Sequence, residues 1–493
     1  MEHLSKEISE NQRIVEERLR GCDDILLRPI MLGKDRETAC FLIYIETAVS
    51  NLMLEDSVIG RFLNGLRSME QAELYETLEK DGMGLSDTGK LWDMEAAFAA
   101  MLAGNAVLFA DGLDFALKIG SKGYPGSGAQ KTDSEKGLRG SKEAFSESVK
   151  MNTALIRKRI RNAKMKAEEK QVGRYSATTT ALLYLDGVVY LPICEEMRKR
   201  LDAFEVDGIE DGGMIEYLTR KKKEGRFPVY QTTERPDRAA QAILEGRVVL
   251  LTDNSPEALI FPATLNSLFQ TADDYYRNER IVTFLRLIRY VAAFLALALP
   301  GLYVAAATFH PQLLPGNLIR SMAEARSGVP FPTAAEVLLM ELSFELLREA
   351  GLRMPGPAGN TIGIVGGLIV GQAAVSANLV SPITVTVAAL TALGSFSIPN
   401  EELSEVFRLW KYGILLLGSC FGILGVMLGC FLLLMLMAEQ ESYGIPWLYP
   451  YVGGNLNERA DEKDSMFLAA ARKRKRRPIF AKWGNRIRFR RKS

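Results

Sequence analysis

Three glutamates stand one helical turn apart in the second half of the chain: Glu341, Glu345 and Glu349. Because neighbours are four positions apart, their carboxylates share one face of a helix, where like charges repel. In a symmetric ring of subunits, each would become a circle of carboxylates that concentrates cations at a pore mouth. Four arginines offer the alternative of simple neutralisation: Arg320, Arg326, Arg348 and Arg353. Both readings stay open at this point.

A second polar set lies within an apolar run that follows these glutamates. Polar side chains there would cost free energy if they faced lipid. At helical spacing, one face of the run combines polar and aliphatic side chains, which suits a gated, water-filled path. The pore-lining candidates are Val365, Ile369, Gln372, Ser376 and Leu379. Hydrogen bonding between helices is the alternative role of the polar members.

The chain offers little to a catalyst or a metal site. It contains two histidines, His3 and His310, so a zinc site of the HExxH type is excluded. Its five cysteines are scattered, without metal-like spacing, and we interpret them as reduced packing residues. No nucleophile and base stand in a recognisable arrangement. We therefore expect no enzyme, no metal and no cofactor.

Long apolar runs in the second half predict a multi-span membrane domain over residues 276–455. Residues 290–309 carry no charge and have the length that a helix needs to cross about 30 Å of hydrocarbon. Similar runs follow at 361–379, 383–398 and 413–437. Residues 333–350 are too charged to cross lipid alone and predict an amphipathic helix, at the interface or re-entering the protein.

Glycines recur at four-residue spacing within these runs, so that helix backbones could approach closely, within or between subunits. The helix-packing candidates are Gly363, Gly367, Gly371, Gly418 and Gly422.

Basic residues predict the orientation of the chain. Four arginines precede the first span, and residues 471–493 hold twelve Lys or Arg and no acidic residue. Both termini are therefore expected on the cytoplasmic side. We expect the basic tail, residues 456–493, to contact anionic lipid headgroups rather than nucleic acid.

The first half predicts a soluble α/β part made of two similar subdomains, residues 1–120 and 171–275. In each, a strand-like run is followed about sixty residues later by a helix that ends at a glycine, Gly104 or Gly246, and then by a further strand. Residues 121–170 are expected to form a loop and a basic connecting helix. The fold class is thus α/β with an all-α transmembrane domain.

Several strings along the chain resemble the GerA family of bacterial spore germination proteins, specifically its A-type subunits. The most specific are GVPFPTAAEVLLMELSFELLREAGLRMP, residues 328–355, and IVGGLIVGQAAV, residues 364–375. The others are residues 138–160, 252–262 and 273–278. The resemblance covers residues 25–455.

This resemblance implies a protein of the spore inner membrane that assembles as a ring, expected to be a pentamer, around an ion-conducting path. The path would correspond to residues 364–375 and the glutamate-rich helix to residues 334–348. The implied partners are another germination membrane protein and potassium or other monovalent cations. Two functions stay open: an ion channel subunit that mediates or amplifies cation release during germination, and a non-conducting membrane scaffold that binds other germination proteins.

Overall fold

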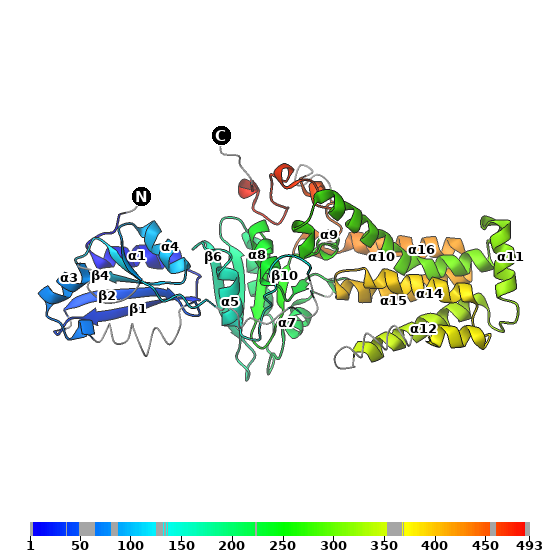
Figure 1. Cartoon of the computed structure of the whole chain (residues 1–493), viewed down its shortest axis with the longest axis horizontal. Coiled ribbons are helices and arrows are strands. Elements are labelled where there is room, and N and C mark those ends of the chain that lie inside the picture. The colour runs from blue at the N-terminus through cyan, green and yellow to red at the C-terminus, as the bar shows by residue number, and fades with distance from the viewer. Residues whose placement is uncertain are drawn as a thin grey trace. The chain divides into compact units, whose positions relative to one another are not determined.

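The computed structural model describes residues 3–488 apart from 36, 49–64, 80–86, 125–131, 133–134, 136, 222–223, 353–366, 368 and 454–459. The chain divides into two compact units (Figure 1). Unit 1 contains Met1–Arg220, Tyr230–Pro262 and Arg474–Ser493, and unit 2 contains Lys221–Val229 and Ala263–Lys473. The C-terminal part of the basic tail therefore belongs to the α/β unit, because it folds back onto it.

Unit 1 holds two five-stranded sheets with one topology. The first repeat has the strand order β1-β2-β4-β5-β3 and the second has β6-β7-β9-β10-β8. The first repeat contains α1 (Ile8–Leu19), β1 (Ile25–Leu32), β2 (Thr38–Ile45), α3 (Gln71–Glu79), β3 (Thr88–Leu91), α4 (Met94–Leu102), β4 (Ala106–Ala110) and β5 (Ala116–Ile119). The second contains α5 (Val149–Arg157), β6 (Met165–Val172), β7 (Thr178–Leu185), α6 (Leu191–Asp202), α7 (Gly212–Thr219), β8 (Gln231–Thr233), α8 (Pro236–Glu245), β9 (Val248–Thr252) and β10 (Ala258–Phe261).

The two repeats also share individual hydrogen bonds. Asn11 receives the backbone N–H of Ser5 and donates to the Ser5 carbonyl at 2.6 Å. Asn152 makes the same pair of bonds to Ser146, again donating at 2.6 Å. Both asparagines are buried, where an amide without partners would be costly. Such matching detail supports the interpretation of the two sheets as copies of one unit.

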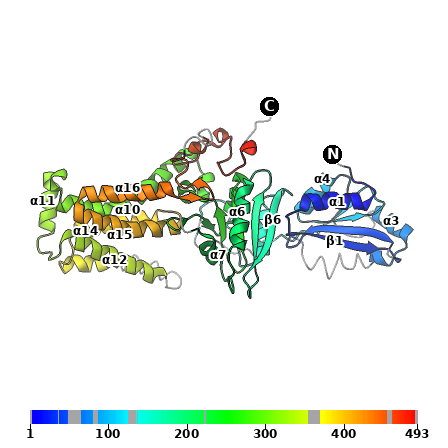
Figure 2. The same ribbon diagram turned by 180° about the vertical axis from the view of Figure 1, so that it is seen from behind.

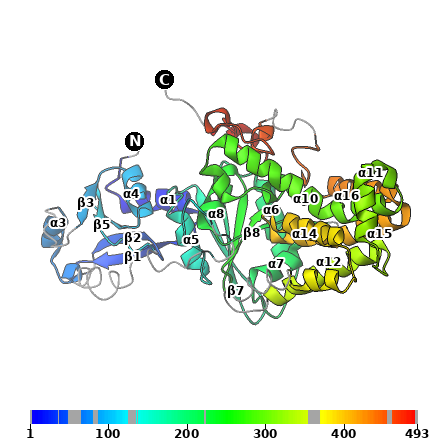
Figure 3. The same ribbon diagram turned by 45° about the vertical axis from the view of Figure 1, so that its right-hand side comes forward.

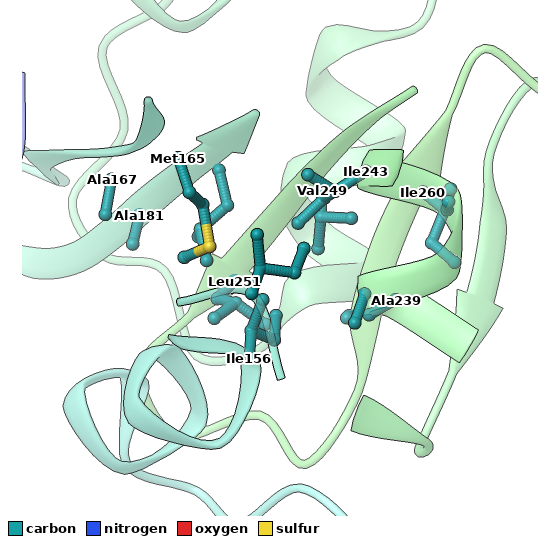
Figure 4. Packing of buried hydrophobic residues seen from close by; sticks show 14 of the residues in the cluster. Ile156, Met165, Ala167, Ala181, Ala239, Ile243, Val249, Leu251 and Ile260 are labelled. Atoms are coloured by element: carbon teal, nitrogen blue, oxygen red, sulfur yellow. The ribbon is translucent and has the colours of Figure 1, made fainter. Parts of the chain in front are cut away.

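The core of the second repeat lies between its sheet and two helices. Ile156 from α5, with Ala239 and Ile243 from α8, packs on strand residues such as Met165 and Val249 (Figure 4). Helices α6 and α7 lie on the opposite face of the sheet, which is seen from behind in Figure 2. Burial of the apolar strand side chains under α5 and α8 is the principal source of stability for such a layer.

The predicted extent of the connecting helix is wrong. The helix α5 covers only Val149–Arg157, and residues 165–172 form β6, the edge strand of the second sheet. Polar side chains on this edge strand obscured the alternation that predicts a strand. The second repeat therefore begins before residue 171, with α5 inside its core.

Burial makes the cysteines of unit 1 poor nucleophiles. It raises the pKa of the Cys40 thiol and of the Cys194 thiol to about 12 in each case. Cys22 is buried as well, and its pKa is also raised. Since the thiolate is the reactive species, these three residues are expected to be inert at neutral pH.

Unit 2 is helical. Its main elements are α9 (Leu265–Leu268), α10 (Glu279–Thr308), α11 (Gly316–Ala325), α12 (Thr333–Leu352), α14 (Pro382–Phe396), α15 (Glu401–Phe421) and α16 (Ile423–Glu439), followed by the short strands β11 (Glu441–Ser442) and β12 (Ile445–Pro446). Helix α10 packs against α14 and α15, α16 folds back along α15, and α12 packs on α14 (Figure 3). Among the described residues, α10 alone is long and apolar enough to cross a membrane; α14 and α16 are apolar but shorter.

The sequence predicts one helix over the run 413–437, and this prediction is wrong. The run is divided at Gly422, whose φ of 64° and ψ of −144° belong to a region open essentially to glycine. The chain turns back there, and the end of α15 packs against α16. A Cβ on Gly425 would stand 2.0 Å from the Leu417 carbonyl oxygen, so only a glycine permits this approach.

Candidate functional site

A line of ion pairs joins α12 to α15, and we call it the charged seam: Glu341–Lys411, Glu345–Arg408 and Arg348–Glu401. The Nζ atom of Lys411 donates to Oε2 of Glu341 at 2.6 Å, and the two side chains are only 6% and 2% exposed. Arg408 donates to Glu345, and Arg348 lies 3.3 Å from Glu401. The charges of Glu341 and Lys411, this deep in an apolar unit, require each other as partners.

The partners of Glu341 and Glu345 are not the arginines that the sequence suggested. Glu341 and Glu345 are both neutralised by residues of α15, whose contact with α12 no local spacing could reveal. Glu349, the third candidate at a pore mouth, is exposed near the end of α12. In this arrangement Glu341 is not a free carboxylate, because Lys411 neutralises its charge.

A second buried carboxylate was missed as a site residue. Glu336 is fully buried, and its Oε2 accepts the backbone N–H of Ser381 at 2.8 Å and the hydroxyl of Thr384 at 3.0 Å. Its other oxygen accepts from Arg326 at 3.2 Å. Glu336 therefore accepts hydrogen bonds from groups at the first turn of α14 and links α12 to that helix. The Ser381-Pro382 pair, a helix start, was the available signal.

The pore-lining candidates that the structure describes are all exposed. Ile369 is 59% exposed, Leu379 is 40% exposed, and Gln372 and Ser376 are also exposed. On the opposite side of the same helical stretch, Ala374 is buried. Val365 lies outside the described residues. Ile369, Gln372 and Ser376 thus lie on one side of the helix, whereas Leu379 follows the end of the helix, beyond Asn378 with its φ of 53°.

The glycine candidates divide into contacts and a turn. Gly367 faces Phe344, and Gly371 faces Val385. A Cβ on Gly418 would lie 3.0 Å from the carbonyl oxygen of Gly301, so α10 and α15 approach there through two glycines. Gly422 forms the turn between α15 and α16, and Gly363 lies outside the described residues.

Arginines at the start of α10 take part in a buried ionic cluster. Asp274 bonds Arg289 through both carboxylate oxygens at 2.9 Å and Arg286 at 3.0 Å. Arg286 also reaches Asp464 at 3.0 Å. Burial opposes the ionisation of Asp274, but the hydrogen bonds and positive charges of the two arginines outweigh it and lower the pKa of this carboxyl. These two arginines anchor the start of the helix, besides any part that they play in orientation.

Metal chemistry finds no support in the part of the chain that the structure describes. No group of three or more His, Cys, Asp or Glu side chains there is placed to hold a metal ion.

The fold and the charged seam define a class of protein in which a duplicated α/β unit is joined to an apolar helical unit with internally neutralised charges. The chain belongs to the Bacillus/Clostridium GerA spore germination protein family, whose model matches residues 13–480.

Individual relatives extend over nearly the whole chain. The uncharacterized membrane protein YfkQ of Bacillus subtilis is 36% identical, over 95% of this chain and 90% of its own length. The spore germination protein KA of the same organism is 34% identical, over 91% of this chain and 81% of its own. Spore germination protein A1, also from Bacillus subtilis, is 33% identical over 90% of each chain.

One solved structure is also similar, the N-terminal domain of the A subunit of the Bacillus megaterium spore germinant receptor GerK3. It is 26% identical, with a TM-score of 0.40, and the match covers 53% of this chain and 97% of that domain. Within the family, the sequence most resembles the stage V sporulation protein AF. The relatives named above do not test this finer assignment, so it stays a prediction.

Proposed function

We propose that this protein is a subunit of an oligomeric channel in the spore inner membrane that mediates or amplifies the release of monovalent cations during germination. One observation carries the proposal: Gln372 and Ser376 lie exposed on the outer side of an apolar helical unit. Facing lipid, these groups would lose their hydrogen bonds to water. Facing a water-filled path between subunits, they keep them.

The proposed path combines these polar groups with the exposed aliphatic side chains of Ile369 and Leu379. Wet polar rings and dry aliphatic rings in series are what a pore needs in order to conduct and to close. Glu349, exposed beyond the charged seam, is the glutamate best placed to attract cations to a pore mouth.

Assembly follows from the same surface. One chain leaves the face open, so a closed ring of identical chains, which we expect to be a pentamer, would bury it around a central axis. We further propose that the chain crosses the membrane several times and that both termini are cytoplasmic. Its partners would be a second germination membrane protein and anionic headgroups near the basic residues. Family membership supports its setting in germination.

Replacing Gln372 by leucine tests the path. A leucine of similar length removes the polar ring, and we expect potassium efflux from proteoliposomes to fall severalfold while the amount of inserted protein stays constant. Leu393→Ala is the control, because Leu393 is 62% exposed on α14 and is not one of the pore-lining candidates. Equal efflux from the native chain and from Gln372→Leu would place the path elsewhere.

A non-conducting scaffold is the second candidate, since the exposed surface of the helical unit would equally suit docking of other membrane proteins. A scaffold predicts an inserted oligomer that leaves liposomes tight to potassium. It also predicts that Gln372→Leu changes the capture of a partner and not the efflux.

A further inference from the structure

Both repeats of unit 1 leave the same place open for a passing segment, at the glycine that ends a helix. In the first repeat this is Gly104, with φ of 93°, and a Cβ there would stand 2.9 Å from the ring of Tyr124. Tyr124 comes from the chain that follows β5, and its hydroxyl donates to the Leu102 carbonyl at 2.9 Å. Beside it, the N–H of Gly123 donates to the Ala48 carbonyl at 2.7 Å.

The second repeat shows the same arrangement with a different donor segment. Gly246 ends α8 with φ of 93°, and a Cβ there would stand 2.7 Å from the Cα of Ala481. Arg477 donates from Nε to the Leu244 carbonyl at 2.9 Å. The N–H of Lys482 donates to the Val188 carbonyl at 2.7 Å.

The acceptors correspond position by position. Leu244 stands two residues before Gly246, as Leu102 stands before Gly104. Val188 follows the last residue of β7 at the distance at which Ala48 follows the last residue of β2. The first repeat fills the place from its own next residues. In the second repeat the chain leaves at Pro262 for unit 2, so its next residues are not available.

We propose that residues 474–488 are the displaced last element of the second repeat, and that the notch beside Gly246 is a peptide-binding site that the chain fills with its own C-terminal segment. The site takes a looped segment with a small residue in its centre, because the contact with Gly246 leaves no space for a larger side chain. Ala481 meets this requirement: it is 1% exposed and belongs to the core of the second repeat.

Aromatic and basic residues around Ala481 match the rim of the notch. The guanidinium of Arg247 lies over the ring of Phe480, 5.4 Å from its centroid, and Phe480 is buried. Arg488 reaches Glu245 at 3.3 Å. A small antiparallel loop shapes the segment, since the N–H of Arg488 bonds to the Lys475 carbonyl at 2.8 Å. These contacts give the basic sequence a structural role that does not depend on lipid.

The docked segment makes unit 1 depend on chain from beyond the last helix of unit 2. This inference is independent of the proposed conduction of ions.

Trypsin cleavage after Lys482 reports on docking in the full-length protein, because the N–H of this residue is bonded in the notch. Ala481→Glu would place a carboxylate in the core, and we expect cleavage at this bond to accelerate at least about tenfold. Ile487→Glu adds the same charge at a residue that is 51% exposed, and should be cleaved at the native rate. Each cleavage rate is followed by mass spectrometry.

Cleavage within the first repeat serves as an internal control and should be equal in all three proteins, which excludes general unfolding of the variant. A chain truncated after residue 473 should also bind a labelled peptide of residues 474–493 in fluorescence anisotropy, with the Ala481→Glu peptide bound at least about tenfold more weakly. Equal cleavage after Lys482 in the native chain and in Ala481→Glu, or equal binding of the two peptides, would overturn the proposal.

Discussion

Replacing Lys411 by methionine is expected to lower the free energy of unfolding of the helical unit by about 3–5 kcal/mol, because the substitution leaves the charge of Glu341 buried without its partner. Methionine fills a similar volume, so the loss reports on the charge rather than on a cavity. The unfolding midpoint of the detergent-solubilised protein, followed by the fluorescence of the fully buried Trp447 of this unit, measures the effect.

An exposed ion pair of the same unit provides the matched control. Arg226 and Glu439 lie 2.8 Å apart, with side chains that are 51% and 63% exposed. Arg226→Met should therefore cost less than about 1 kcal/mol. A midpoint that shifts equally in Lys411→Met and in Arg226→Met would show that the seam is not a buried pair.

The double variant Glu341→Met, Lys411→Met separates the charge from the pairing. Removing both charges avoids the penalty for an unpaired ion, so most of the stability lost in Lys411→Met should return. An effect on function that persists in the stable double variant would then belong to the seam itself.

The second large effect is expected where the two α/β repeats meet. Arg157, fully buried, grips Asp24 of the first repeat with two hydrogen bonds, at 2.6 Å and 2.9 Å, and donates to the Met165 carbonyl at 2.7 Å. Arg157→Met leaves Asp24 buried and unpaired, at a cost of about 3–5 kcal/mol.

Cys22 provides a local measurement of this loss, since its thiol lies buried at the same contact, 3.5 Å from the Met165 carbonyl oxygen. We expect the rate at which a maleimide labels Cys22 to rise about a hundredfold or more in Arg157→Met. Arg157 lowers the pKa of this thiol, so its removal alone would slow the labelling. A faster rate therefore reports opening of the contact.

Lys150→Met is the control for this second substitution. Lys150 and Glu46 form an ion pair at 2.7 Å with side chains 44% and 37% exposed, and their loss should leave the labelling of Cys22 near the native rate. If Arg157→Met labels no faster than Lys150→Met, the repeats are not held by the buried pair.

The duplication could be predicted from the sequence because its signals are local. Apolar strands such as β2 and β7 and the glycines at 104 and 246 recur at nearly constant spacing. The edge strand β6 could not, because a strand with one open side carries charged residues, and MKAEEKQV shows no clean alternation.

The helical unit shows a similar division. Helical spacing alone placed Gln372 and Ser376 on one side of a helix, since that requires only the geometry of a turn. The break at Gly422 was hidden because hydropathy is uniform across it. The partners Lys411 and Arg408 were hidden as well, because contacts between α12 and α15 depend on tertiary packing. The docked tail is a long-range contact of the same kind.

Potassium efflux from liposomes that contain the purified native chain, with any membrane protein that co-purifies, tests the central claim most directly. The account predicts efflux well above that of protein-free liposomes, reduced by Gln372→Leu and unchanged by Leu393→Ala. Inserted, oligomeric protein that leaves the liposomes tight to potassium would contradict the channel and favour the scaffold.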